Sequence, residues 1–153
     1  MVDKIHSTST FNQGFLTVEF LASAIMDMKL HLAGDASIDP AAFEKDTLKE
    51  LQMPDEVVMR HRIPQFGHVF SGEDYASGYY GYLWAQVLDY DAFEAFTESK
   101  GGAYDAGVAK KYRDYILSVG NTVDPGENYR KFRGRDATVD AFLKARGFPL
   151  AKD

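Results

Sequence analysis

The spacing of apolar residues along the chain predicts helices. Between residues 13 and 32, Leu21, Ala24 or Ile25, Met28 and Leu32 recur at steps of three and four positions, as on one face of an α-helix. Comparable spacing recurs in several later segments of the chain, and no segment alternates in the manner of a half-buried strand. The pattern therefore predicts an all-α fold, an irregular bundle of about six helices.

Helix boundaries are marked by capping residues. Asp39-Pro40 has the order of an N-cap and a first helical residue, and Asp124-Pro125 repeats it. Gly34 is a plausible stop for the first helix, and Pro54 ends the second. Further helices are expected over residues 105–119, 124–132 and 138–146.

The centre of the chain combines a loop with a long helix. Residues 65–74 lack periodicity and contain His68, whereas residues 75–99 read as one helix. Winding that helix from Tyr75 places Tyr75, Tyr79 and Tyr82 on one face. A second face of this helix is expected to belong to the core and consists of Tyr80, Leu83, Trp84 and Val87. A groove of small residues is expected beside the tyrosines and consists of Gly78, Gly81 and Ala85.

Length and charge narrow the class of protein. The 153 residues suffice for one ordinary domain, so residues 1–153 are expected to form a single helical unit. A formal net charge of −6 disfavours nucleic acid or an anionic membrane as the main partner. The chain has no cysteine, which fits a cytoplasmic location. Its longest apolar run is broken by Glu19 and Asp27 and is therefore not expected to span a membrane.

Candidate chemistry gathers around His68. Phenol hydroxyls beside an imidazole and a small-residue groove could hold a peptide and donate hydrogen bonds to a developing oxyanion. An aromatic row at helical spacing is nevertheless typical of a core, so that reading stays open. His31 suits the negative end of the first helix dipole, and His61 reads as a surface residue. Residues 129–135 alternate between basic and aromatic side chains and are interpreted as a solvated helix face. Glu19 lies on a mostly apolar helix and is interpreted as a buried acid.

The segment His68–Trp84, HVFSGEDYASGYYGYLW, resembles the histidine–tyrosine segment of the thimet oligopeptidase and peptidyl-dipeptidase family of zinc metallopeptidases. The seven-residue step from His68 to Tyr75 is closer to the bacterial peptidyl-dipeptidase branch. Thr10–Asp27 resembles the segment that follows the zinc site of this family, and Tyr129–Gly147 resembles the family's carboxyl terminus. The resemblance covers nearly the whole chain.

The resemblance implies the carboxyl-terminal portion of a catalytic domain that hydrolyses short peptides. The zinc-binding H-E-x-x-H motif is absent from this sequence, so zinc would be bound by residues outside it, and no metal ligand is assigned here. In the family, the residues matching His68, Tyr75 and Tyr82 contact the substrate and the tetrahedral intermediate. Tyr82 or Tyr75 would donate to the oxyanion, with His68 supporting the substrate backbone. The substrate-binding set implied by the resemblance is His68, Tyr75, Gly78, Tyr79 and Tyr82.

The expected partners are a peptide substrate and the missing amino-terminal part of the same enzyme, which would cover an apolar docking face. Self-association through that face is a further expectation. Two other hypotheses stay open: a non-catalytic helical module that binds peptides, and a structural helical domain whose tyrosines form its core.

Overall fold

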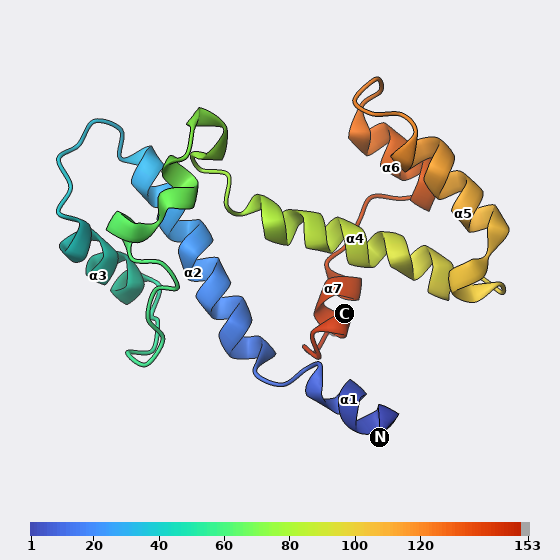
Figure 1. Cartoon of the computed structure of the whole chain (residues 1–153), viewed down its shortest axis with the longest axis horizontal. Helices are drawn as coiled ribbons and strands as arrows, with labels where there is room; N and C mark the ends of the chain where they lie inside the picture. The colour runs from blue at the N-terminus through green and yellow to red at the C-terminus, as the bar shows by residue number, and fades with distance from the viewer. Residues whose placement is uncertain (151–153) are drawn as a thin grey trace. The chain divides into compact units, whose positions relative to one another are not determined.

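A computed structural model describes residues 1–150, apart from the side chains of Asp3 and His6, so residues 151–153 of the expected unit lie outside the described part. Every regular element within the described residues is helical, which confirms the all-α prediction. The chain divides into two compact units, Met1–Tyr82 and Leu83–Asp153. Figure 1 shows the helices of each unit.

The first unit is built on one long helix. Its elements are α1 (Val2–Thr8), α2 (Gln13–Leu32), α3 (Pro40–Glu50) and the 3-10 turns η1 (Ile63–Gln65), η2 (Gly67–Phe70) and η3 (Glu73–Tyr75). The bounds of α2 match the apolar period of the sequence. Asp39 caps α3 as predicted, since its Oδ1 accepts a hydrogen bond from the Ala42 N–H at 2.7 Å. The green 3-10 turns run alongside α2 (Figure 1).

Two apolar clusters hold the first unit together, one on each side of α2. The first joins α2 to α3 and η1 and consists of Ala22, Met26, Met59 and Ile63, with Leu30, Phe43, Leu48 and Met53 against them. The second joins α2 to the turns and consists of Ala24, Phe66, Val69 and Tyr79, with Phe20 against them. The predicted loop is therefore not a loose connection, because its apolar side chains form half of this core.

The second unit begins within α4. Its elements are α4 (Gly81–Thr97, whose first two residues belong to the first unit), the 3-10 turn η4 (Gly102–Tyr104), α5 (Ala106–Tyr112), the π-helical turn η5 (Arg113–Leu117), α6 (Pro125–Arg133) and α7 (Asp140–Ala145). Asp124 caps α6 as predicted, accepting from the Glu127 N–H at 2.8 Å. The helix expected over 105–119 instead widens after Tyr112, where the Ser118 N–H reaches back five residues to the Arg113 carbonyl.

A buried carboxylate organises the second unit. Asp91 on α4 is fully buried, and its oxygens lie 2.6 Å from the Tyr129 hydroxyl, 3.3 Å from Arg133 Nε and 2.8 Å from Arg135 Nη2. Arg133 also forms a bidentate pair with Glu98 at 2.7 and 2.8 Å. The interpretation of residues 129–135 as a solvated face is therefore wrong for Arg133, whose side chain is only 7% exposed.

Candidate functional site

His68 lies at the centre of the predicted site. It is carried by η2, and its ring centroid lies 5.1 Å from that of Tyr75, 5.7 Å from Tyr79 and 5.8 Å from Tyr82. The structure thus brings together the histidine and all three tyrosines that the sequence singled out.

One of these contacts is a hydrogen bond. Tyr82 Oη lies 3.2 Å from His68 Nε2, and the Tyr82 side chain is 53% exposed. The imidazole tautomer decides which group donates, because a neutral ring carries its proton on one nitrogen only. With the proton on Nε2, His68 donates to the phenol oxygen and leaves the Tyr82 O–H free for another acceptor.

Tyr79 has a different environment from the other two tyrosines. It is buried, stacked on Phe20 at a centroid distance of 4.9 Å and edge-on to Phe66 at 4.8 Å. Burial raises the pKa of the Tyr79 hydroxyl, an effect that the Arg60 guanidinium opposes. Tyr79 is therefore a core residue with one edge at the site, whereas Tyr75 and Tyr82 are about half exposed.

The sequence predicted that the three tyrosines form a row on one helix, and this prediction is wrong. Tyr75 ends η3, Ser77 has a left-handed backbone with φ of +58°, and α4 begins only at Gly81. The expected core face is also wrong in part, because Trp84 is 66% exposed and Tyr80 49%. The rings meet because the chain turns between them, not because they share helical spacing.

Asp27 explains why the chain turns there. This α2 carboxylate is 1% exposed; its Oδ1 accepts from the Ser77 N–H at 3.1 Å and its Oδ2 from the Tyr79 N–H at 3.0 Å. Those two N–H groups are thereby withdrawn from helical hydrogen bonding. His31 Nδ1, one turn further along α2, lies 2.9 Å from Asp27 Oδ1. The buried carboxylate is thus fully partnered, as burial requires.

Sequence reasoning missed Asp27 and singled out Glu19, which is only half-buried. The signal was available, because Asp27 lies three positions after the buried Ala24 and four before His31, on an apolar face. His31 was assigned to the helix dipole, but its ring pairs with Asp27 and lies 5.8 Å from that of Phe70.

Gly78 has a backbone role in this turn. A Cβ built there would lie 3.3 Å from the Tyr75 carbonyl oxygen and 3.5 Å from that of Asp74. The absence of a side chain therefore lets the turn close on itself. A contact between Gly78 and substrate stays a prediction.

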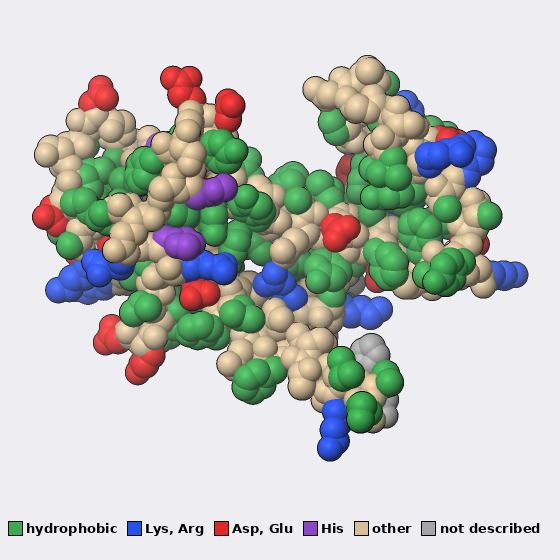
Figure 2. Space-filling view, viewed as in Figure 1, with side chains coloured by type: hydrophobic (Ala, Val, Ile, Leu, Met, Phe, Trp, Pro, Cys, Tyr) green, Lys and Arg blue, Asp and Glu red, His purple; other side chains and the backbone are tan. Residues whose placement is uncertain are grey.

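A pocket of about 320 Å³ opens beside His68. Its lining residues all belong to the first unit and are Phe20, Arg60, His61, His68, Tyr79 and Tyr82. His61 is exposed, as predicted, but its ring also stacks on Phe66 at 5.1 Å and contributes to this wall. Figure 2 shows histidine and basic side chains on the same visible face of the first unit.

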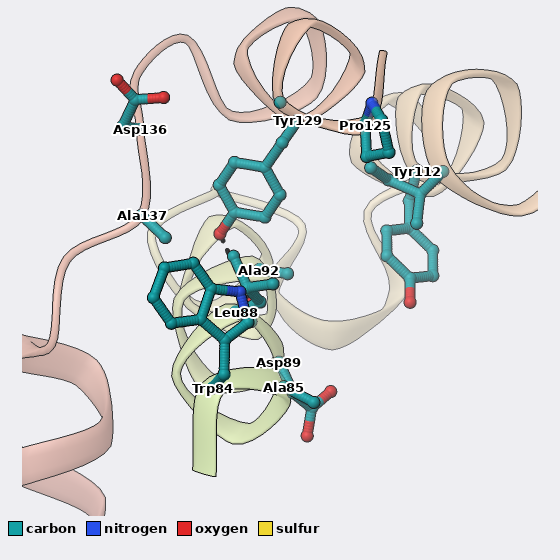
Figure 3. Close-up of a pocket in the computed structure, with 12 residues that line it drawn as sticks. Trp84, Ala85, Leu88, Asp89, Ala92, Tyr112, Pro125, Tyr129, Asp136 and Ala137 are labelled. Atoms are coloured by element: carbon teal, nitrogen blue, oxygen red, sulfur yellow. Dashed lines mark hydrogen bonds between the residues drawn. The ribbon is translucent and has the colours of Figure 1, made fainter. Parts of the chain in front are cut away.

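The second unit contains a larger and more apolar pocket of about 730 Å³. In Figure 3 the rings of Trp84 and Tyr129 border it, and the Tyr129 hydroxyl points to α4, where it donates to the Leu88 carbonyl at 3.4 Å. Because Tyr129 also donates to Asp91 at 2.6 Å, its phenol is held in place. This pocket contains none of the residues of the sequence-predicted site.

The described residues do not fit a zinc site. Among the described side chains of residues 1–150, which leave out those of Asp3 and His6, no three His, Asp or Glu groups come together in a way that could hold a metal ion. In the same part of the chain, no helix combines the length and apolarity needed to cross a membrane.

Comparison with known proteins identifies the family. The family model for peptidase family M3 matches residues 1–148. The chain is 35% identical over 149 residues to a dipeptidyl carboxypeptidase of Salmonella typhimurium and 36% identical over 141 residues to an oligopeptidase A of Haemophilus influenzae. The chain therefore belongs to peptidase family M3, which confirms the resemblance found in the sequence.

The matches are uneven in coverage. They include 95% of this chain but 21% of the Salmonella protein, and 90% of this chain but 20% of the Haemophilus protein. The chain thus spans about a fifth of the length of these relatives.

Proposed function

We propose that this chain is the carboxyl-terminal portion of an M3 peptidase catalytic domain that hydrolyses short peptides. Within it, the pocket beside His68 contacts the substrate and stabilises the tetrahedral intermediate. Support comes from the family membership, from the share of the relatives that is matched, and from one geometric observation: the half-exposed Tyr82 lies 3.2 Å from His68 at the wall of a pocket.

Tyr82 is the proposed oxyanion donor. In the Nε2–H tautomer His68 donates to Tyr82 Oη, and this polarises the phenol O–H toward an acceptor in the pocket, since linked hydrogen bonds strengthen one another. That acceptor is the oxygen that becomes negatively charged when the peptide carbonyl is attacked. A preorganised donor of this kind is worth about 2.7–4 kcal/mol in the transition state.

Tyr75 is the second candidate donor. Its ring packs edge-on against His68 at 5.1 Å and its side chain is 47% exposed, but it does not line the pocket. Tyr79 is assigned to the wall of the pocket that faces the substrate. Gly78 is assigned to the turn that holds this wall in place. Zinc is assigned to residues outside this sequence. The roles proposed for His68 and the tyrosines do not include binding the metal.

The apolar docking face of this proposal is assigned to exposed side chains. In the first unit these include Phe11, just before α2, and Phe15, Leu16 and Val18 in its first turns, which are 72, 47, 46 and 38% exposed. The proposed cover is the amino-terminal part of the same enzyme. A second copy of the chain would take its place when that part is missing.

The test compares the chain with the complete peptidase that contains it. The complete enzyme should hydrolyse short peptides, whereas the chain alone should bind them without hydrolysis, because it lacks the H-E-x-x-H motif. Hydrolysis by the purified chain at the rate of the complete enzyme would refute the proposal. Peptide binding by a complete protein that hydrolyses nothing would favour the non-catalytic module instead.

A further inference from the structure

His31 bridges the two segments that carry the candidate site. Its Nδ1 lies 2.9 Å from Asp27 Oδ1, the oxygen that also accepts from the Ser77 N–H at 3.1 Å. The His31 ring also lies 5.8 Å from the ring of Phe70, the last residue of the turn η2 that carries His68. One side chain of α2 therefore contacts both the carboxylate that holds the tyrosine turn and the turn that holds the histidine.

The surroundings of Nδ1 fix the tautomer of His31. Nδ1 lies 2.9 Å from Asp27 Oδ1 and 2.9 Å from the backbone carbonyl oxygen of Asp27, and both of these atoms are acceptors. Nδ1 therefore carries the proton and donates it to Asp27 in a hydrogen bond. The torsion that sets the plane of a carboxylate is soft, so a donor on Oδ1 helps to keep Oδ2 facing the Tyr79 N–H, which lies 3.0 Å away.

The turn that Asp27 holds is under backbone strain. Ser77 has a φ of +58°, in the left-handed region that residues with a side chain rarely adopt. Such a conformation persists only where its surroundings overdetermine it. Here the surroundings are the two hydrogen bonds to Asp27, a carboxylate that His31 holds in turn. Weakening the His31 contact therefore lets the turn relax, and the turn ends three residues before Tyr82.

We propose that His31 is a positioning residue for peptide hydrolysis. It orients Asp27, and Asp27 fixes the turn that keeps Tyr82 within hydrogen-bonding reach of His68. This inference rests on the proposed function, and it adds a residue that does not itself line the pocket. Because His31 acts through the oxyanion donor and not on the bound substrate, its loss should lower kcat with little change in KM.

The experiment compares His31→Asn with His31→Gln in the complete peptidase. Asparagine places an amide N–H close to the position of Nδ1, whereas glutamine carries the amide one bond further out, near the position of Nε2. The asparagine variant should keep kcat within about twofold of wild type, and the glutamine variant should lose about tenfold, because small displacements of reacting groups are costly. A purely structural role predicts the opposite order, since glutamine is the better helix former.

Two double variants test the route from His31 to the site. Combined with Tyr82→Phe, His31→Gln should lower kcat by no more than about a further twofold, because the group that it positions is already gone. Combined with Ser77→Gly, the cost of His31→Gln should fall from about tenfold to about threefold or less, because glycine adopts a positive φ without strain.

Leu48→Ala is the matched control for lost stability, because Leu48 packs against the other apolar cluster of the first unit. It should destabilise the enzyme and keep the wild-type kcat. Equal kcat for His31→Asn and His31→Gln, or a full tenfold loss in the Tyr82→Phe background, would overturn the inference and leave the proposed function intact. Wild-type kcat in the single variant Tyr82→Phe would instead overturn the proposed function, and the inference with it.

Discussion

The carboxylate of Asp27 accepts a hydrogen bond from the backbone N–H of Tyr79, 52 residues further along the chain, at 3.0 Å. Through this bond and the one to the Ser77 N–H, the long helix α2 fixes the turn that carries the tyrosines. The position of Tyr82 against His68 therefore depends on a carboxylate that binds the backbone between these two residues. Asp27 is in this sense a positioning residue for the candidate site.

Asp27→Asn should lower the free energy of unfolding by about 2–3 kcal/mol, because hydrogen bonds to a charged group contribute about 1.5–3 kcal/mol each. An asparagine keeps one acceptor oxygen but turns an amide N–H₂ toward the second backbone donor. Urea unfolding of both proteins measures the difference. Asp35→Asn is the matched control, since Asp35 is exposed on the same unit, and its stability should stay within about 0.5 kcal/mol of wild type.

Tyr82→Phe should lower kcat of the complete peptidase by about 10²–10³-fold with little change in stability. The substitution removes one hydroxyl from a side chain that is already 53% exposed, so packing is preserved while the proposed oxyanion donor is lost. Steady-state kinetics on one short peptide checks this.

Tyr80→Phe is the control for that measurement, because Tyr80 is a near neighbour with 49% exposure and does not line the pocket. It should keep the wild-type kcat. A Tyr82→Phe enzyme with unchanged kcat would remove Tyr82 from the mechanism.

The sequence predicted the features that depend on neighbouring residues and missed those that depend on residues far apart in the chain. The bounds of α2 and the caps at Asp39 and Asp124 were predictable because a helix period and an N-cap are local. The turn over Ser77–Tyr79 was not, because its N–H groups bind a carboxylate about 50 residues away.

The second unit gives the same lesson. Residues 129–135 read as a solvated face because no local feature marks their partner. Arg133 is buried only because α6 lies against α4, where Asp91 accepts from it. By contrast, the pairing of His68 with the tyrosines was found, since all four lie within 15 residues and carry the family resemblance.

Asp91 should make the stability of the chain fall at acidic pH. Burial would raise the pKa of Asp91, but the Tyr129 hydroxyl and the guanidinium groups of Arg135 and Arg133 hold it below its usual value. A carboxyl with a lowered folded-state pKa contributes stability above its unfolded pKa, about 3.9, and loses that contribution as pH falls through the folded value. Urea unfolding between pH 7 and pH 3 should show this loss.

Asp91→Asn isolates this contribution. At pH 7 it should cost about 3–5 kcal/mol, because it removes the charge of a fully buried carboxylate that pairs with Arg133 and Arg135. The difference from wild type should narrow below about pH 4. Asp89→Asn is the control, because Asp89 is an exposed neighbour on α4, and its stability should vary with pH as that of the wild type does. If the stability of Asp91→Asn also runs parallel to that of the wild type over this pH range, the role assigned to Asp91 is contradicted.

Gly78 and Gly81 form a matched pair that tests whether the turn positions the site. An alanine Cβ at position 78 would lie 3.3 Å from the Tyr75 carbonyl oxygen, so the turn must open by a few tenths of an ångström. At Gly81, the first residue of α4, a Cβ meets nothing within 4 Å, and alanine should stabilise the helix by about 0.5–1 kcal/mol. Gly78→Ala should therefore lower kcat several-fold and Gly81→Ala should not. Equal kcat in the two variants would mean that the site tolerates movement of the Tyr75 backbone, and that Tyr82 and His68 keep their contact without the turn.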